Sequence, residues 1–140
     1  PYGPRFGTLV HAVLNAAVGG AAVEYAAPSL ARSLGCDEAE TSAAEEAARA
    51  ALQHWLLQRA RASARCYREL PVSLRIGDGN IMEGTIDLAF EDDGAFCVVD
   101  YKTDAPSGAV LAKYQRQVGW YGEALRRIAG KPVRCYLLSV

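Results

Sequence analysis

The sequence lacks the features of a membrane protein, a secreted protein or an iron–sulfur protein. No apolar run in its 140 residues approaches the roughly 18 residues that a membrane span requires. No basic segment precedes an apolar core as in a signal peptide. The four cysteines, at positions 36, 66, 97 and 135, are too widely spaced for a zinc knuckle or an iron–sulfur loop. These absences predict a reduced, cytoplasmic protein with single cysteine side chains.

Excess charge of either sign is also missing. The formal net charge is −1, so any signal for nucleic-acid binding must be local. No Gly-x-x-x-x-Gly-Lys-Ser/Thr pattern occurs, and we therefore expect no nucleotide site. Apolar residues make up 51% of the chain and charged residues 22%, which are the values of a globular protein of one domain.

Hydrophobic periodicity predicts helices in the first half of the chain and mostly strands in the second. Thr8 is expected to cap a helix that the Gly19-Gly20 pair ends, and Ser42 and Glu45 have the spacing of a capping box for a long helix. The other expected elements are helices at 28–35, 42–65 and 110–128 and strands at 67–76, 81–90, 96–103 and 133–140. Three successive strands and a helical crossover predict an α/β fold with a mixed sheet.

Three charged residues are expected to converge on this sheet. Asp100 and Lys102 are two residues apart on a strand, so their side chains leave the same face. Asp87 lies on the preceding strand of a tight hairpin. Two close carboxylates repel each other, and a divalent cation relieves the repulsion. Carboxylate oxygens favour Mg²⁺ or Mn²⁺ over zinc.

The alternative interpretation of the same residues is an ion pair on an exposed face of the sheet. An Asp-x-Lys triplet by itself is weak support for a site. The apolar run Phe96–Val99 precedes the triplet, however, and indicates an inner strand. Charges that follow such a run are usually paired or functional.

Five short motifs, taken together, resemble one known family. They are Gly7-x-x-x-His11, Arg68-Glu69-Leu70-Pro71, Gly84-x-x-Asp87, Asp100-Tyr101-Lys102-Thr103 and Tyr114-x-x-Gln117-x-x-x-Tyr121. In this order they resemble the nuclease domain of RecB/AddA-type, exonuclease V-like helicase–nucleases, in the PD-(D/E)XK superfamily. The resemblance implies the core order α-β-β-β-α-β, here with one or two extra N-terminal helices. Ile86 precedes Asp87 where the superfamily's name has a proline, as in the RecB-type subgroup.

The resemblance also implies a role for each motif residue. Asp87, Asp100, His11 and the backbone carbonyl of Tyr101 would bind the catalytic Mg²⁺ or Mn²⁺. Lys102 would position or activate the attacking water. Gln117 and Tyr121 would line the site near the scissile phosphate, and Glu69 would support it in a role that the motif does not define. Outside this context His11 would be interpreted as a packing histidine, as we interpret His54 and Trp120.

The implied activity is a Mg²⁺- or Mn²⁺-dependent deoxyribonuclease that acts with a helicase in DNA repair and recombination. The chain begins at Pro1, and we expect it to be one nuclease domain, residues 1–140, cut from the C-terminus of a longer helicase–nuclease. Residues 109–134 carry six basic residues against Glu123 alone, which predicts a local DNA-binding surface. The alternatives are a catalytically silent module of the same fold and a nuclease with an iron–sulfur cluster. The scattered cysteines argue against the second.

Overall fold

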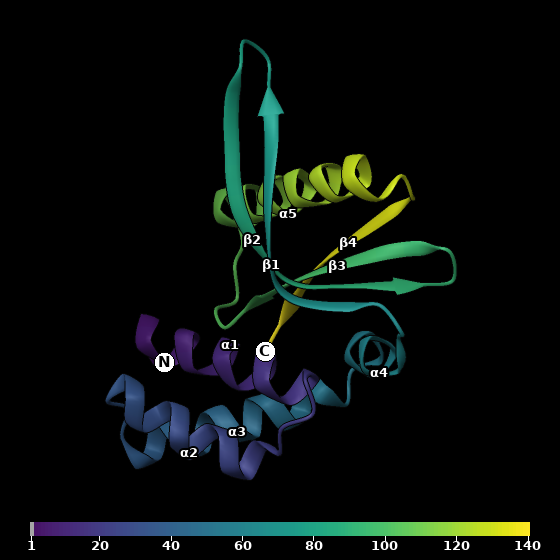
Figure 1. The fold of residues 1–140 in the computed structure, drawn as a ribbon. Coiled ribbons are helices and arrows are strands. Elements are labelled where there is room, and N and C mark those ends of the chain that lie inside the picture. Colours follow the sequence, from purple (N-terminus) through teal and green to yellow (C-terminus); the bar gives the residue numbers. More distant parts are fainter. Residues whose placement is uncertain (1) are drawn as a thin grey trace. The chain divides into compact units, whose positions relative to one another are not determined.

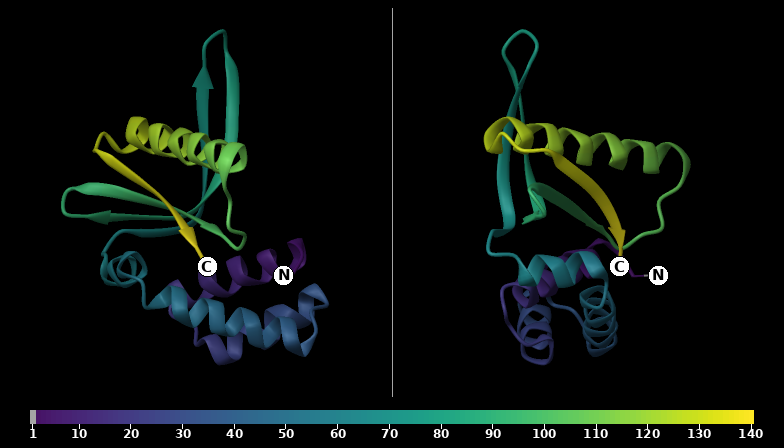
Figure 2. Two further views of the ribbon diagram at one scale, coloured as in Figure 1. Left: turned by 180° about the vertical axis from the view of Figure 1, so that it is seen from behind. Right: turned by 90° about the vertical axis from the view of Figure 1, so that its right-hand side faces the viewer.

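The computed structural model describes residues 2–140, which divide into two compact units. One unit ends at Ala62 and also takes in Val140, and the other is Ser63–Ser139. Figures 1 and 2 show that the first unit is helical and that the second is a sheet with a long helix against it. No helix in residues 2–140 is long and apolar enough to span a membrane.

The first unit is built from four helices with small buried side chains. Its elements are α1 (Pro4–Val18), α2 (Val23–Leu34), α3 (Glu38–Leu52) and α4 (Trp55–Ala62). The buried stripe of α1 consists of Leu9, Val10, Val13, Leu14 and Ala17. The buried residues of α2 and α3 are mostly alanines, which allow helices to pack closely, and both helices pack against α1.

The structure corrects all three predicted helix starts in this unit. The helix expected at 28–35 begins at Val23 and has Pro28 in its interior. Helix α1 begins at Pro4, where the missing N–H of proline costs nothing, and Thr8 lies inside the helix with its hydroxyl donating to the Pro4 carbonyl. The capping box of α3 is formed by Asp37 and Glu40 rather than Ser42 and Glu45. Glu40 also forms an ion pair with Arg5, 2.7 Å between Oε2 and Nη2. This earlier pair therefore satisfies the helix terminus and joins α3 to α1.

The long helix expected at 42–65 is two helices. Helix α3 ends at Leu52 and α4 begins at Trp55. The His54 side chain lies between them, where its Nδ1 accepts a hydrogen bond from the Leu56 N–H at 3.2 Å. A side chain that satisfies a free helix N–H stabilises a helix start, so His54 is a local cap rather than a residue within one long helix.

The second unit confirms the α/β fold and the mixed sheet. Its elements are β1 (Cys66–Ile76), β2 (Asn80–Asp92), β3 (Ala95–Lys102), α5 (Gly108–Ala129) and β4 (Val133–Ser139). The strands lie in the order β1-β2-β3-β4, with antiparallel pairing between the first three and parallel pairing of β3 with β4. Four helices precede β1, one more than the periodicity indicated, because the long helix is divided.

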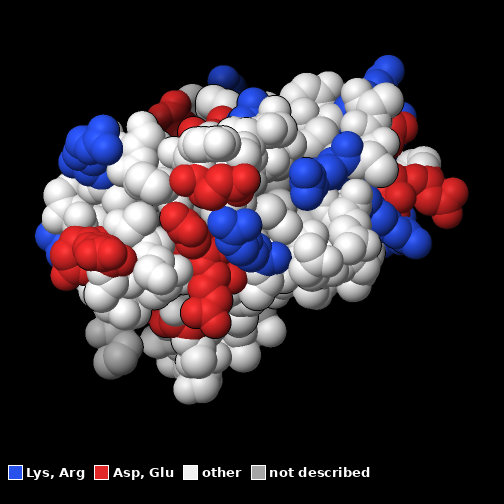
Figure 3. All heavy atoms as spheres, turned by 90° about the horizontal axis from the view of Figure 1, so that it is seen from below, with Lys and Arg blue, Asp and Glu red and all other residues white. Residues whose placement is uncertain are grey.

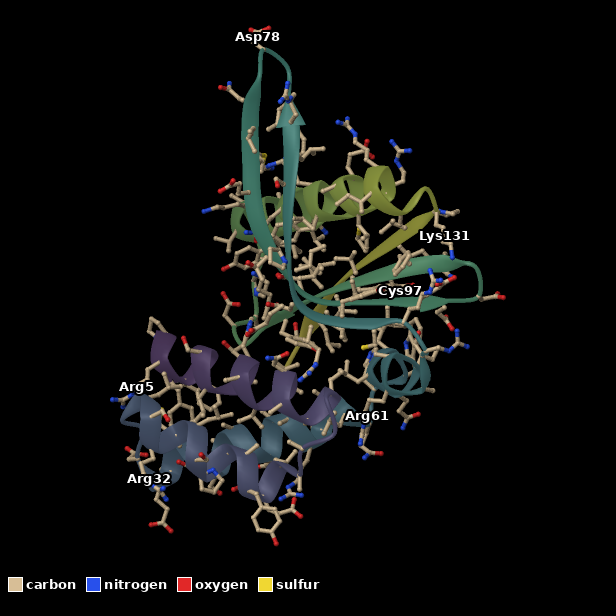
Figure 4. All side chains as sticks on the ribbon, viewed as in Figure 1. Arg5, Arg32, Arg61, Asp78, Cys97 and Lys131 are labelled. Atoms are coloured by element: carbon tan, nitrogen blue, oxygen red, sulfur yellow. The ribbon has the colours of Figure 1, made fainter. Side chains whose placement is uncertain are left out.

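Helix α5 covers one face of the sheet. The core beneath it consists of Val72, Leu74, Ile86, Ala89, Phe96, Val98, Val118, Ala124 and Leu125. Strand β3 lies between β2 and β4, and every residue from Ala95 to Tyr101 is buried. The β1–β2 hairpin extends beyond the rest of the sheet to a turn at Asp78 (Figure 4). The inner strand that the apolar run predicted is therefore present, and Asp100 lies near its end.

Gly122 allows α5 to approach β4 closely. A Cβ atom at this position would overlap with the Cys135 Sγ and lie 3.5 Å from Val133 Cγ1. Gly119, one turn earlier on the same helix, has no atom within 4 Å of its Cβ position. The two glycines therefore form a matched pair, one with a packing role and one without.

We expect Gly122→Ala to lower the free energy of unfolding by about 1–3 kcal/mol, because a methyl group must be forced into a filled contact. Gly119→Ala should instead raise it by up to about 1 kcal/mol through helix propensity. Urea denaturation of both variants measures the difference. Equal stabilisation by the two substitutions would show that the α5–β4 contact is looser than described.

Candidate active site

Asp87 lies where the pairing of β1 with β2 is interrupted. The ladder passes from Arg68–Leu88 to Leu70–Ile86 and skips Glu69 and Asp87. Glu69 has a φ of 48°, in the left-handed region that side chains disfavour. Such irregularities bend a strand and redirect its side chains. The Asp87 carboxylate faces β3, where its Oδ2 accepts the backbone N–H of Tyr101 at 2.9 Å.

Asp100 and Lys102 share one face of β3, as their spacing predicted. Lys102 Nζ lies 2.8 Å from Asp100 Oδ2. The Asp100 and Asp87 carboxyl groups are close enough to hydrogen-bond when one of them is protonated. Asp100 is only 6% exposed, so this contact is made away from bulk water. The structure therefore brings together the three charged residues on which the sequence analysis depends.

The electrostatics of this cluster follow from its burial. Burial raises the pKa of the Asp100 carboxyl, Lys102 opposes the increase, and Asp87 adds to it. Burial alone would lower the pKa of the Lys102 ammonium, but its contact with Asp100 outweighs this and the net pKa is raised. Lys102 therefore stays positively charged beside a carboxyl group whose ionised form is disfavoured by burial.

Two predicted residues approach the cluster from α5. The Tyr121 ring packs over Gly84, where a Cβ atom would lie only 2.9 Å from the tyrosine hydroxyl oxygen. Gln117 is close enough to the Tyr121 hydroxyl to lower its pKa slightly. Burial raises the pKa of the Tyr121 hydroxyl, and the charges of Asp100 and Asp87 raise it further. The glycine of the Gly84-x-x-Asp87 motif thus makes room for the tyrosine of the α5 motif.

Tyr114 also belongs to the cluster, although the sequence analysis gave it no role. Lys102 Nζ lies 3.9 Å from the centre of the Tyr114 ring. The Tyr114 hydroxyl donates to Asp104 Oδ2 at 3.4 Å. Tyr114 is three residues before Gln117 and seven before Tyr121, so all three share one helix face. That spacing was the signal that could have identified it.

The roles of the remaining predicted residues stay predictions. His11 is half-buried on α1, in the helical unit, and its metal-binding role stays a prediction. The Tyr101 N–H is used by Asp87, while the role of its carbonyl stays a prediction. Glu69 is exposed, and the visible effect of this position is the backbone irregularity opposite Asp87.

The donor set of the cluster fits a hard divalent cation. Asp100 Oδ2 is buried, and no hydrogen-bond donor is aligned with it despite the nearby ammonium. Within residues 2–140 no group of three or more His, Cys, Asp or Glu side chains forms a metal site. Mg²⁺ commonly binds through one or two carboxylates and fills its other positions with water and phosphate oxygens. Asp87 and Asp100 meet that requirement.

A sequence profile of the PD-(D/E)XK nuclease superfamily matches residues 2–140 of this chain. The chain belongs to this superfamily. The matched region covers nearly the whole chain and therefore includes both carboxylates, Lys102 and the α5 motif.

Two curated relatives are named as subunits of a helicase/nuclease. An ATP-dependent helicase/nuclease subunit from Clostridium kluyveri (strain NBRC 12016) is 35% identical over 82 residues, which is 55% of this chain and 7% of that protein. A protein of the same name from Clostridium botulinum (strain 657) is 38% identical over 79 residues, which is 53% of this chain and 6% of that protein. The resemblance to RecB/AddA-type nuclease domains is confirmed, and the chain spans a small part of these relatives.

The basic surface of this PD-(D/E)XK nuclease is smaller than the sequence predicted. Of the six basic residues between 109 and 134, four have partners: Arg126 and Arg127 with Glu123, Lys131 with Glu91, and Arg134 with the Asp92 carbonyl (Lys131 is labelled in Figure 4). Lys113 and Arg116 are exposed and make no ion pair in residues 2–140. Figure 3 shows another face, seen from below, on which acidic and basic side chains are interspersed. The count along residues 109–134 included Glu123 but not Glu91, which lies outside that range and pairs with Lys131.

Proposed function

We propose that this chain is a Mg²⁺- or Mn²⁺-dependent deoxyribonuclease that hydrolyses phosphodiester bonds. The observation that carries the proposal is the contact of a buried Asp100 with both Asp87 and Lys102. Two carboxylates beside one ammonium leave one negative charge without compensation in a partly buried cluster, and a divalent cation would compensate it. Membership of a nuclease superfamily and the names of the curated relatives support the same activity.

Each residue of the site has a role in this reaction. Asp87, Asp100 and the Tyr101 carbonyl would hold the divalent ion, with His11 as a further ligand. The ion would lower the pKa of a bound water and stabilise charge on the phosphate. Lys102 would orient the attacking water and stabilise developing negative charge as a fixed cation.

Gln117 and Tyr121 would position the scissile phosphate. Both come from α5, which also carries the exposed Lys113 and Arg116. These groups recognise a phosphate backbone rather than bases, so cleavage would be independent of sequence.

We further propose that the chain is the nuclease module of a longer helicase–nuclease that acts in double-strand-break repair and recombination. The support is the name of the relatives, which describes an ATP-dependent helicase/nuclease, and the small part of them that this chain covers. ATP-driven unwinding would be performed elsewhere in the full-length protein and would deliver a single strand to the site.

Digestion of linear and circular DNA with Mg²⁺, Mn²⁺ or EDTA tests the proposed activity. Degradation that requires a divalent ion is expected, and EDTA should abolish it. Loss of linear DNA with survival of circles would indicate an exonuclease, whereas nicking of circles would indicate an endonuclease. DNA binding without cleavage in either metal would instead favour the catalytically silent module.

His11→Ala is expected to weaken Mn²⁺ binding by about tenfold or more, because one ligand is lost from the site. His54→Ala is the matched control, since it removes the chain's other histidine from a helix cap. Isothermal titration calorimetry without DNA measures both affinities. Unchanged Mn²⁺ binding in His11→Ala would show that this histidine is a packing residue.

Digestion by the 140-residue chain alone is expected to be weak, assisted by Mn²⁺ and sensitive to salt. Few basic side chains are available to contact phosphates, and each such contact weakens as salt displaces it, with a slope of about −0.7 per phosphate on single strands. Rates measured between low and physiological salt, beside the full-length protein, test this. Processive, salt-insensitive degradation by the isolated chain would contradict the proposed dependence on a helicase.

A further inference from the structure

The Lys102 ammonium has two neighbours within the second unit. It lies 2.8 Å from Asp100 Oδ2 and 3.9 Å from the centre of the Tyr114 ring. The Lys102 side chain is only 17% exposed, so it has little access to water as an alternative. Its charge is compensated mainly by the Asp100 carboxylate, with a smaller contribution from Asp87, and by one aromatic face.

The first of these neighbours is also the group that a divalent ion requires. Asp100 Oδ2 is buried and has no aligned hydrogen-bond donor. An ammonium group in contact with this oxygen repels a second cation that approaches it. Binding of a divalent ion at Asp100 therefore requires that Lys102 shift away while its charge remains compensated.

We propose that Tyr114 is a positioning residue that holds the Lys102 ammonium when a divalent cation occupies Asp100. The proposal rests on the proposed function, because it concerns the same site. An aromatic face attracts an ammonium group without offering an oxygen that would compete for the metal ion. The Tyr114 ring is fixed by its place on α5 and by the hydrogen bond of its hydroxyl to Asp104.

Mn²⁺ titration calorimetry without DNA tests this role in Tyr114→Leu, Tyr114→Phe, Lys102→Met and the Tyr114→Leu/Lys102→Met double variant. Tyr114→Leu should weaken Mn²⁺ binding by about three- to tenfold, because Lys102 then remains on Asp100. Tyr114→Phe retains the ring and should stay within about twofold of the parent chain. In the Lys102→Met background the leucine substitution should have no effect, since the competing ammonium is gone.

Cleavage provides a second readout. At saturating Mn²⁺, Tyr114→Leu should lower kcat by about tenfold with little change in KM, and Tyr114→Phe should restore it. If the leucine variant does not fold, Tyr114→Met takes its place in every measurement, because it also removes the ring and its flexible side chain adapts to the gap.

An equal loss of Mn²⁺ affinity from Tyr114→Leu in both backgrounds would overturn the proposal, because it would reveal a general packing effect. Unchanged affinity in the single variant would overturn it as well. A parent chain that binds no Mn²⁺ would instead refute the proposed metal-dependent function. If the parent binds Mn²⁺ and Tyr114→Leu binds it equally well, the positioning role is refuted but the metal-dependent function is not.

Discussion

Replacing Asp100 with asparagine is expected to reduce DNA cleavage by about 10³-fold or more while the protein stays folded. A bound metal ion contributes several kcal/mol of charge stabilisation in such reactions, and about 1.4 kcal/mol corresponds to a factor of ten. The asparagine retains the shape of the side chain but removes the charge that would attract the ion. Cleavage assays under saturating Mn²⁺ measure the loss.

Thermal unfolding of the same variant separates catalysis from folding. The pKa of native Asp100 is raised, so the folded chain retains a proton that the unfolded chain has released, and stability falls as pH rises through this range. Asp100→Asn removes this cost, and its metal-free stability at neutral pH should equal or exceed that of the parent. The parent should gain about 2.7 kcal/mol at an Mn²⁺ concentration of about 100 times Kd, and the variant should not.

Asp78→Asn is the matched control for Asp100→Asn. It makes the same chemical change in the same unit, but at the exposed turn of the β1–β2 hairpin (Figure 4). Its cleavage rate and its response to Mn²⁺ should match those of the parent. An Asp100→Asn chain that is unfolded without metal would show that Asp100 is structural, and the proposed catalytic site would lose its main support.

Lys102→Met is expected to lower turnover by about 10²–10³-fold while retaining metal binding. The methionine fills a similar volume but supplies neither a positive charge nor a proton donor. Because the ammonium lies 2.8 Å from Asp100 Oδ2, its removal should leave Mn²⁺ binding equal or tighter. Calorimetry and single-turnover cleavage measured on one preparation distinguish the two effects.

Lys113→Met provides the control for the loss of one positive charge. Lys113 is exposed on α5 and forms no ion pair in residues 2–140. Its replacement should weaken DNA binding modestly and make it less dependent on salt, with kcat little affected. Loss of Mn²⁺ binding in Lys102→Met, or a kcat effect no larger than that of Lys113→Met, would contradict the role proposed for Lys102.

Local chemistry was sufficient to predict most of the second unit. The strands alternate polar and apolar residues or form short apolar runs, and the Gly77-Asp78-Gly79 turn connects β1 to β2. The helix and the parallel strand that follow Lys102 then require a crossover. The pairing of Asp100 with Lys102 followed from the two-residue period of a strand, which holds wherever a strand is regular.

The helical unit was predicted less accurately because its signals compete. Ser42 and Glu45 satisfy a capping pattern, but Asp37 and Glu40 satisfy it five residues earlier and also place a carboxylate beside Arg5. Nothing in the local sequence decides between two valid caps. The break between α3 and α4 at His54 was missed for the same reason. A histidine can cap a helix, but it can also lie within one, and the local sequence does not decide which.

The sequence by itself determined the order of the elements in the second unit, the mixed sheet and the identity of Asp87, Asp100 and Lys102 as the candidate catalytic group. Only the tertiary structure decided which neighbouring groups compensate the charges of these three residues. It placed Tyr114 against Lys102, packed Tyr121 over Gly84, and used four of the six basic residues near α5 in contacts with the chain itself. The physical reason is the distance along the chain over which each effect acts. Periodicity and turn chemistry act over a few residues, whereas burial and charge compensation depend on groups that only the folded chain brings together.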